Sequence, residues 1–271
     1  MEEQKRRVVA AFDLASDTYN EPALRCFDLH ALALIREAQV HEGAQVLDVA
    51  TGTGKVAFAA ARAVGPRGRI VGIDLAEGML AQARRRTGSL PVEFRLMDAE
   101  KLEFDDATFD VVLCGFAVWF LPDILRGMRE MQRVLRPGGR LAFSTWAKQS
   151  HEPMMEMMQA RLERYGTRRV PPPAESWKKC EEPEHLLTLL EKTGFRDRQV
   201  VPQPAGYFIE PEDWWTFLWG AAPRGRLSRL PPESLARFRK EILEEVRSLK
   251  GEHGIWFDVS ALIGIGLREH E

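Results

Sequence analysis

Short apolar runs alternate with helical patterns along residues 1–145, and turn residues separate them. Apolar runs bounded by turns predict buried strands, and alanine-rich or amphipathic stretches predict helices. Strands separated by helices pair in parallel through right-handed crossovers, so a ligand is expected at the carboxyl ends of the strands. The expected strands lie at 45–49, 69–74, 92–98, 109–115 and 140–145, and the expected helices between them at 55–64, 77–86 and 121–136.

After residue 150 the pattern is less regular. Helical patterns lie at 152–164, 183–192, 212–219 and 233–249, and strand patterns at 198–209 and 255–267. We expect an α/β protein with a Rossmann-like, seven-stranded, doubly wound sheet and a helical cap built from C-terminal insertions.

Composition narrows the class of protein. With 271 residues, 45% of them hydrophobic and 29% charged, the chain has the profile of a soluble globular protein. A net charge of −2 favours neither a nucleic-acid partner nor an anionic membrane. No apolar run approaches the ~20 residues of a membrane span, and the charged N-terminus does not resemble a signal peptide. Cys26, Cys114 and Cys180 form no CxxC pair, so we expect a cytoplasmic protein without disulfides or a zinc site.

The candidate chemistry begins in the loop after the first expected strand. Gly52-x-Gly54-x-x-Ala57 matches nucleotide-binding loops, and Asp74 lies where a ribose-binding acid is expected. This pattern alone leaves both NAD and S-adenosylmethionine (SAM) open. Asp48 favours SAM, because a carboxylate beside the loop would repel a pyrophosphate and attract the ammonium group of a methionine.

Five segments resemble, in order and spacing, the motifs of class I SAM-dependent methyltransferases. The sequence is most similar to the branch that holds the ubiquinone- and menaquinone-biosynthesis C-methyltransferases and many small-molecule methyltransferases. The resemblance covers about residues 8–146, and Ala50-Thr51 stands where many relatives have Gly-Cys. The five segments are 46–54, 73–75 with Met79, 98–100, 109–112 and 135–139.

The resemblance implies a role for each matching residue. Asp48 and the glycine loop would hold the methionine end of SAM, Asp74 the ribose hydroxyls and Asp98 the exocyclic amine of the adenine. Tyr19 would close over the methyl group. Asp74 and Asp98 also fit helix or turn caps. The expected cofactor-binding residues are Tyr19, Asp48, Ala50, Thr51, Gly52, Thr53, Gly54, Asp74, Leu75, Met79, Asp98, Ala99, Glu100, Cys114 and Gly115.

The acceptor side is marked by aromatic residues and methionines. No carboxylate lies in 113–120, where a metal-dependent catechol-type enzyme would need one, so we expect no metal. His151 is the candidate catalytic base, because it follows the fifth strand and an imidazole titrates near neutral pH. Many of the apolar residues also fit ordinary packing between cap and core. The expected substrate-binding residues are Phe116, Trp119, Trp146, Met154, Met158, Trp215 and Trp219.

These observations predict SAM-dependent methyl transfer to a small, largely apolar or aromatic acceptor, as O- or C-methylation. A SAM-binding regulatory module without turnover and an NAD-dependent oxidoreductase stay open as alternatives. We expect an N-terminal helical segment at 1–40 that covers the cofactor, a SAM-binding core at 41–149, and remaining strands with cap insertions at 150–271. The insertions are expected at about 150–180 and 211–250. The partner is a small-molecule acceptor, and a homodimer is left open.

Overall fold

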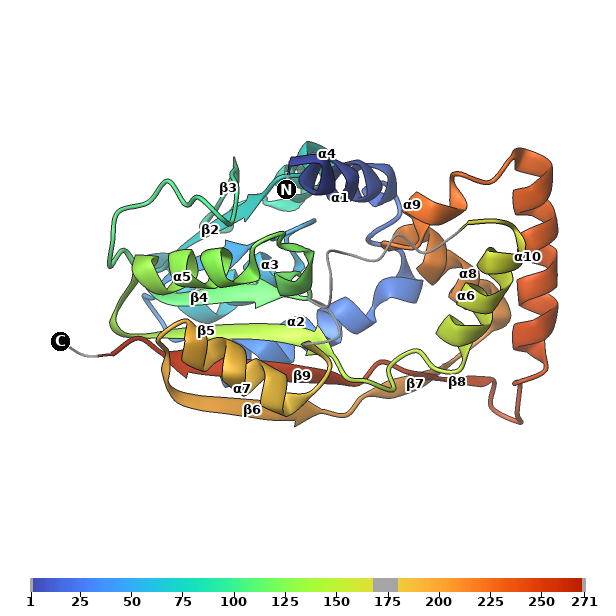
Figure 1. Ribbon diagram of the computed structural model, residues 1–271. Helices are drawn as coiled ribbons and strands as arrows, with labels where there is room; N and C mark the ends of the chain where they lie inside the picture. The colour runs from blue at the N-terminus through green and yellow to red at the C-terminus, as the bar shows by residue number, and fades with distance from the viewer. Residues whose placement is uncertain (1, 168–179, 270–271) are drawn as a thin grey trace.

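Seven strands form one mixed sheet in the order β3-β2-β1-β4-β5-β9-β6 (Figure 1). The structure, a computed structural model, describes residues 2–167 and 180–269. Strands β1 to β5 pair in parallel, and β9 runs antiparallel to both β5 and β6. This arrangement confirms the expected α/β class with a Rossmann-like sheet. The strands are β1 Gln45–Val49, β2 Arg69–Asp74, β3 Val92–Leu96, β4 Phe109–Gly115, β5 Leu135–Trp146, β6 Arg196–Gln203 and β9 Ala261–Leu267.

Helices cover both faces of the sheet because its strands are apolar on both sides. Along β1, Val46 packs into the cluster beneath α2 and α3, whereas its neighbour Leu47 packs into the cluster beneath α5 and α7. Figure 1 shows α5 and α7 in front of the sheet and α2 and α3 behind it. The helices of the two layers are α2 Cys26–Glu37, α3 Lys55–Val64, α4 Glu77–Arg86, α5 Ile124–Val134 and α7 Pro183–Lys192.

A second group of elements gathers beyond the end of β5, at the right of Figure 1. These elements share a hydrophobic cluster of their own around the buried Trp214 and Phe238. We call this group the cap. Its described elements are α6 Met154–Arg164, β7 Gly206–Ile209, α8 Pro211–Gly220, α9 Arg224–Leu227, α10 Pro232–Arg247 and β8 Ile255–Asp258. Part of the expected insertion at 150–180, residues 168–179, lies outside the described residues.

The first helix, α1 Glu2–Ala15, lies against α4 at the top of Figure 1. It buries little of its own surface, and Ala15 is its fully buried residue. Short 3₁₀ turns complete the chain: η1 Pro22–Leu24, η2 Gly65–Arg67 and η3 Val118–Phe120. None of the described helices is long and apolar enough to cross a membrane.

Several element boundaries differ from those expected. The helix expected at 121–136 is shorter, because the Asp123 side chain accepts from the Arg126 backbone N–H at its start and Leu135 already belongs to β5. The strand expected at 198–209 is two strands, β6 and β7, which join different sheets. The residues at 255–267 carry strands as expected, β8 and β9, and these belong to different sheets.

Candidate active site

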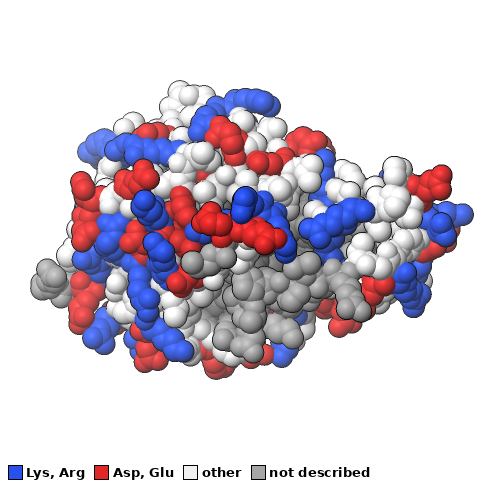
Figure 2. All heavy atoms as spheres, turned by 45° about the horizontal axis from the view of Figure 1, so that its top comes forward, with Lys and Arg blue, Asp and Glu red and all other residues white. Residues whose placement is uncertain are grey.

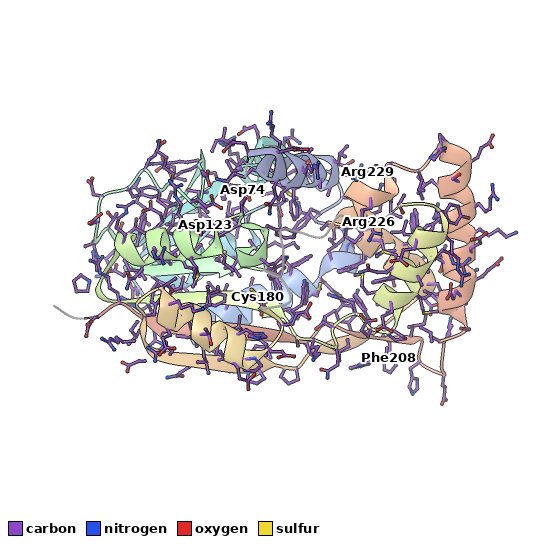
Figure 3. All side chains as sticks on the ribbon, in the orientation of Figure 1. Asp74, Asp123, Cys180, Phe208, Arg226 and Arg229 are labelled. Atoms are coloured by element: carbon purple, nitrogen blue, oxygen red, sulfur yellow. The ribbon has the colours of Figure 1, made fainter. Side chains whose placement is uncertain are left out.

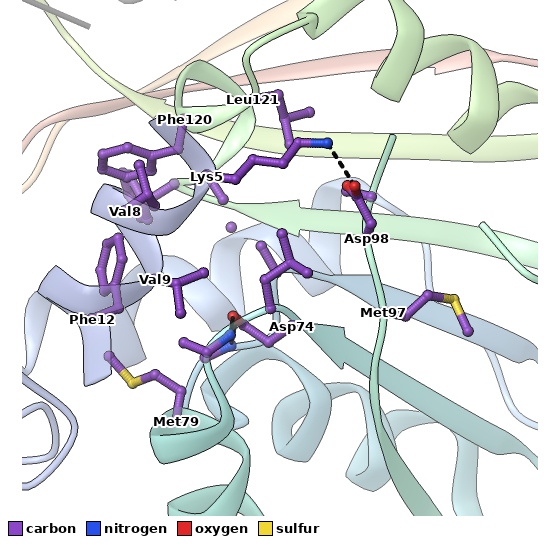
Figure 4. A pocket seen from close by; sticks show the side chains of 18 of the residues that line it. Lys5, Val8, Val9, Phe12, Asp74, Met79, Met97, Asp98, Phe120 and Leu121 are labelled. Carbon is purple, nitrogen blue, oxygen red and sulfur yellow. Dashed lines mark hydrogen bonds and ion pairs between the residues drawn. The ribbon is translucent and has the colours of Figure 1, made fainter. Parts of the chain in front are cut away.

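Three cavities meet where the carboxyl ends of β1, β2 and β4 approach α1 and the cap. We call them the edge cavity, the loop cavity and the cap cavity. The edge cavity, about 110 Å³, lies beneath α1 and is lined by residues such as Val9, Asp74 and Asp98 (Figure 4). The loop cavity, about 40 Å³, lies against the turn after β1. The cap cavity, about 690 Å³, lies between the sheet edge, α6 and α8.

Asp74 ends β2 and holds the wall of the edge cavity in place. Its Oδ2 accepts from the Gly52 backbone N–H at 2.8 Å, and its Oδ1 accepts from the Ala76 N–H at 2.9 Å. Burial raises the pKa of this carboxyl above its usual value. Each oxygen still has acceptor capacity, so Asp74 can receive two further donors from a ligand in the cavity.

Asp98 lies at the opposite wall of the edge cavity, in the turn after β3. Its Oδ1 accepts from the Glu100 N–H at 2.9 Å, which holds the turn. Its Oδ2 lies 2.6 Å from the Lys5 Nζ, and Figure 4 shows this contact reaching down from α1. Apolar side chains separate Asp98 from Asp74, so the cavity has an apolar centre and an acid at each end. The apolar lining includes Val8, Val9, Phe12, Leu75, Met79, Met97 and Phe120.

The loop cavity contains a buried carboxylate with spare acceptor capacity. Asp48 is fully buried, and its Oδ2 accepts from the Thr51 hydroxyl at 2.6 Å. Among the described residues no hydrogen-bond partner reaches its Oδ1. Burial raises the pKa of Asp48 to about 7. A buried acceptor without a hydrogen-bond partner costs free energy, so this carboxylate is suited to a cationic or hydrogen-donating group of a ligand.

The backbone of the turn between β1 and α3 depends on two glycines. Gly52 and Gly54 have φ angles of +54° and +85°, in the left-handed region that favours glycine. A Cβ on Gly54 would lie 2.8 Å from the Phe58 ring, so this position is closed to larger residues. The Thr51 N–H donates to the Ile73 carbonyl of β2 at 2.8 Å, which ties the turn to the sheet.

Tyr19 and Phe116 line all three cavities and mark the point where they join. The Tyr19 ring stacks on Phe27 with ring centroids 5.2 Å apart, and Phe116 stacks on Trp146 at 4.0 Å. Burial raises the pKa of Tyr19, so its hydroxyl stays protonated. The junction is therefore a largely aromatic passage between two small cavities and one large cavity.

The cap cavity has aromatic walls near the junction and a polar rim along α6 and α9. Figure 3 places Arg226 on the cap side and Cys180 near the start of α7, and both line this cavity. Met155, Gln159 and Glu163 lie at i, i+4 and i+8 along α6, so one face of that helix forms a wall. The volume and the mixed lining suit an organic molecule with an apolar body and polar substituents.

His151 lies in the wall of the cap cavity, as expected for the catalytic candidate. Its ring packs against Trp146 and Phe217, with centroids 4.4 and 5.1 Å apart. Burial lowers the pKa of His151 to about 3, so the imidazole is neutral near pH 7. Its Nε2 is buried without a hydrogen-bond partner among the described residues. Its environment thus weakens its capacity to hold an abstracted proton.

Most of the expected cofactor-binding residues line the edge or loop cavity. Gly54, Glu100 and Cys114 line none of the three. Gly54 shapes the turn, Glu100 accepts from the Asp123 N–H at 2.8 Å, and Cys114 is packed inside β4 with a pKa raised by burial. Gly115, the residue after Cys114, reaches both small cavities.

Three of the expected substrate-binding residues do not line the cap cavity. Met154, at the first position of α6, is fully buried in the cap cluster. Trp215 and Trp219 stack on each other with centroids 5.7 Å apart, and Trp215 also faces Phe238 of α10. The other expected residues, Phe116, Trp119, Trp146 and Met158, line the cavity.

Several lining residues were not expected from the sequence. Lys5, Val8, Val9 and Phe12 follow the spacing i, i+3, i+4 and i+7, and this helical periodicity was a detectable signal. Phe27 comes from α2, and Arg226 comes from the cap. Their exposure to a cavity depends on how distant elements pack.

Charge and metal-ligand chemistry add little to this picture. On the face shown in Figure 2, acidic and basic side chains are intermixed. In the part of the chain that the structure describes, no group of three His, Cys, Asp or Glu side chains is placed to hold a metal ion.

The sheet order and the cavities along the carboxyl edge of the sheet are those of the class I methyltransferase fold. Within that class the chain belongs to the ubiE/COQ5 methyltransferase family, which matches residues 1–172. It is similar to aklanonic acid methyltransferase DauC of Streptomyces sp. (strain C5), with 35% identity over 144 residues, 52% of this chain and 66% of that protein. It is also 37% identical to demethylmenaquinone methyltransferase of Staphylococcus aureus (strain JH9) over 141 residues, 51% of this chain and 58% of that protein.

The chain thus spans less than two thirds of the length of these two relatives. Solved structures agree with the fold. A SAM-dependent methyltransferase from Aquifex aeolicus has a TM-score of 0.54 and 25% identity, covering 69% of this chain and 89% of that one. The YcgJ protein of Bacillus subtilis has a TM-score of 0.57 and 21% identity, covering 90% and 100%.

The residues present fit SAM as the cofactor. Its methionine ammonium would meet the spare acceptor of Asp48, and the backbone N–H groups that begin α3 suit its carboxylate. Its ribose and adenine would occupy the edge cavity between Asp74 and Asp98.

Proposed function

We propose that the chain catalyses transfer of a methyl group from SAM to a small, largely apolar or aromatic acceptor, by O- or C-methylation. The observation that carries this proposal is the junction of the cavities at Tyr19 and Phe116. A methyl group held there would face an acceptor in the cap cavity, and both reactants would be shielded from water. A SAM-binding module without turnover has no need for a second cavity of about 690 Å³ that opens onto the same point.

The proposed division of labour follows the cavities. Asp48 and the turn at 51–54 hold the methionine end, Asp74 the ribose, and Leu75, Met79 and Asp98 the adenine. SAM, when bound, supplies an electrophilic methyl group carried on a sulfonium. The aromatic rings at the junction exclude water and orient the acceptor, which are the main contributions a protein can make to a displacement of this kind.

His151 has a defined place in this proposal. Because burial keeps its ring neutral, we assign it to hydrogen bonding with an oxygen substituent of the acceptor. In this role it orients the reacting group and needs no change of protonation. Proton release from the acceptor would then be assisted by bulk water at the rim of the cap cavity.

We also propose that the enzyme works in the cytoplasm and needs no metal. Cys26 and Cys114 are buried thiols outside any disulfide, as is usual in a reducing compartment. The segment 113–120 offers no carboxylate to a metal beside the junction.

The test is a turnover assay with methyl-labelled SAM and a panel of phenols, quinols and carboxylic acids of one to four rings. We expect S-adenosylhomocysteine to form together with an acceptor that gains one methyl group, and the rate to persist in EDTA. The variant Asp48→Asn serves as a control with a weakened cofactor site. Tight binding of SAM with no product from any acceptor would favour a binding module, and loss of the rate in EDTA with rescue by magnesium would overturn the metal-free proposal.

A further inference from the structure

Lys5, on the first helix, is the basic side chain in the described lining of the edge cavity. Its Nζ lies 2.6 Å from Asp98 Oδ2 and 2.8 Å from Glu100 Oε2. The Lys5 side chain is 15% exposed and that of Glu100 only 3%. An ion pair so largely removed from water is held more firmly than a surface pair, and the loss of its cation would leave a buried carboxylate uncompensated.

The two carboxylates are each held from two sides. Asp98 Oδ1 accepts from the Glu100 N–H at 2.9 Å, and Glu100 Oε1 accepts from the Asp123 N–H at 2.8 Å. Lys5 binds the remaining oxygen of each. The ammonium therefore connects α1, the turn after β3 and the start of α5 through one network.

The charge on Lys5 is maintained in this setting. Burial alone would lower the pKa of Lys5, but the hydrogen bonds to Asp98 and Glu100 raise it above the ordinary value. Lys5 thus stays a cation near neutral pH, and Asp98 stays an oriented acceptor. A carboxylate has about four acceptor positions, so Asp98 can accept from Lys5 and from a ligand amine together.

The rest of α1 is an apolar cover over the same cavity. Val9 and Phe12 face Met79 and the Asp74 wall in Figure 4. The Phe12 ring meets Phe120 edge-on at 5.3 Å. At the far end of α1, Asp13 Oδ1 accepts from the Gly78 N–H at 2.8 Å. The helix is therefore fixed by polar contacts at both ends and can press its apolar face onto a ligand.

We infer that Lys5 is a positioning residue for the cofactor, which orients the Asp98 carboxylate toward the exocyclic amine of adenine and couples the docking of α1 to that recognition. The inference rests on the proposed function, because it takes the edge cavity as the site of the adenosyl group. Lys5 acts through Asp98 and does not take part in methyl transfer.

The experiment compares two ligands and three variants by calorimetry. The ligands are S-adenosylhomocysteine and S-inosylhomocysteine, which carries an oxo group in place of the amine. Wild type should prefer the adenosyl ligand. Lys5→Met should weaken binding of the adenosyl ligand about tenfold or more, the scale of one charge-assisted hydrogen bond, and should reduce the preference between the two ligands. Lys5→Arg should restore much of both, and Lys101→Met, an exposed lysine of the same turn, should change neither.

Each other outcome has a distinct meaning. Equal weakening of the binding of both ligands by Lys5→Met would show that α1 only covers the cavity. Unchanged affinity would show that the contact between Lys5 and Asp98 does not contribute to ligand binding. Either result overturns the inference. A wild-type chain that binds neither ligand would instead overturn the proposed function and, with it, this role for Lys5. Circular dichroism on the same samples shows whether each variant is folded.

Discussion

Asp48 lies near the end of β1 and Asp74 ends the neighbouring strand β2, and their carboxylates differ in the hydrogen bonds that they accept. Both oxygens of Asp74 accept from backbone N–H groups of the cavity wall, so this side chain builds the site as well as lining it. Asp48 has one oxygen bound by Thr51 and one without a partner among the described residues. The spare acceptor capacity of Asp48 Oδ1 therefore favours binding of a cationic ligand group.

The pKa of Asp48 predicts a pH dependence of cofactor binding. Burial raises this pKa to about 7 in the free protein, and a bound ammonium favours the ionised form. Affinity for SAM should therefore fall as the pH drops below about 7, approaching tenfold per pH unit. Calorimetry in buffers of different ionisation enthalpy should detect proton release on binding at pH 6. In Asp48→Asn this step should vanish and affinity should be lower throughout; a pH-independent wild type would show that Asp48 is already ionised.

The raised pKa of Asp48 also makes the stability of the free protein depend on pH. Because the folded pKa of Asp48 lies above its unfolded value, the folded state binds this proton more tightly. The stabilisation is complete below about pH 4, the unfolded value, and is lost as the pH rises through 7. Cofactor that binds the carboxylate form should offset this loss at neutral pH.

At the scale of elements, the central strands and their helices were largely predictable. The observed bounds of β1, β2, β4, α3 and α4 match those expected, because each element is bounded by turn residues and buries its apolar positions. The division of 198–209 into β6 and β7 was not predictable, since both halves carry a strand pattern and the sheet that each joins is set by distant partners. The early start of β5 was also missed: 135–139 resembles a turn, yet Leu135 pairs with Phe109 ahead of a register shift.

Gly54, in the turn that begins α3, and Gly43, just before β1, give a matched pair of glycine substitutions. Gly54→Ala places a Cβ 2.8 Å from Phe58 at a φ of +85°, whereas Gly43→Ala at +80° meets no atom within 4 Å. Both should lose about 1 kcal/mol from the left-handed backbone, and Gly54→Ala about 1–3 kcal/mol more from overlap. Urea unfolding measures the stability. SAM affinity should fall only in Gly54→Ala, and equal affinities in the two variants would show that the turn tolerates the shift.

For the whole molecule, the two kinds of site differ in how far the sequence predicts them. The proposed cofactor-binding residues lie in short motifs at strand ends, where chain order and sheet topology bring them together. The residues that line the cap cavity come from elements such as α2, η3, β5, α6 and α8, and their orientation depends on packing between these elements. Met154 and Met155 are adjacent in sequence, yet the first is buried in the cap cluster and the second lines the cavity. Both are apolar, so the sequence contained no signal to separate them.

This division predicts that acceptor binding and cap stability respond to different substitutions. Met155→Ala removes one side chain from the wall of the cap cavity. It should raise the acceptor KM about tenfold, because apolar contacts in a pocket contribute about 1–3 kcal/mol to binding. Trp215→Ala opens a gap between α8 and α10 and should lower the free energy of unfolding by about 1–3 kcal/mol with the acceptor KM unchanged. Both variants should keep wild-type SAM affinity, since neither residue lines the edge or loop cavity. Steady-state kinetics with the acceptor from the turnover assay, urea unfolding and SAM calorimetry on one preparation separate the effects. If Trp215→Ala raised the KM at wild-type stability, Trp215 would belong to the acceptor site, and the cap would bind the acceptor through α8 itself.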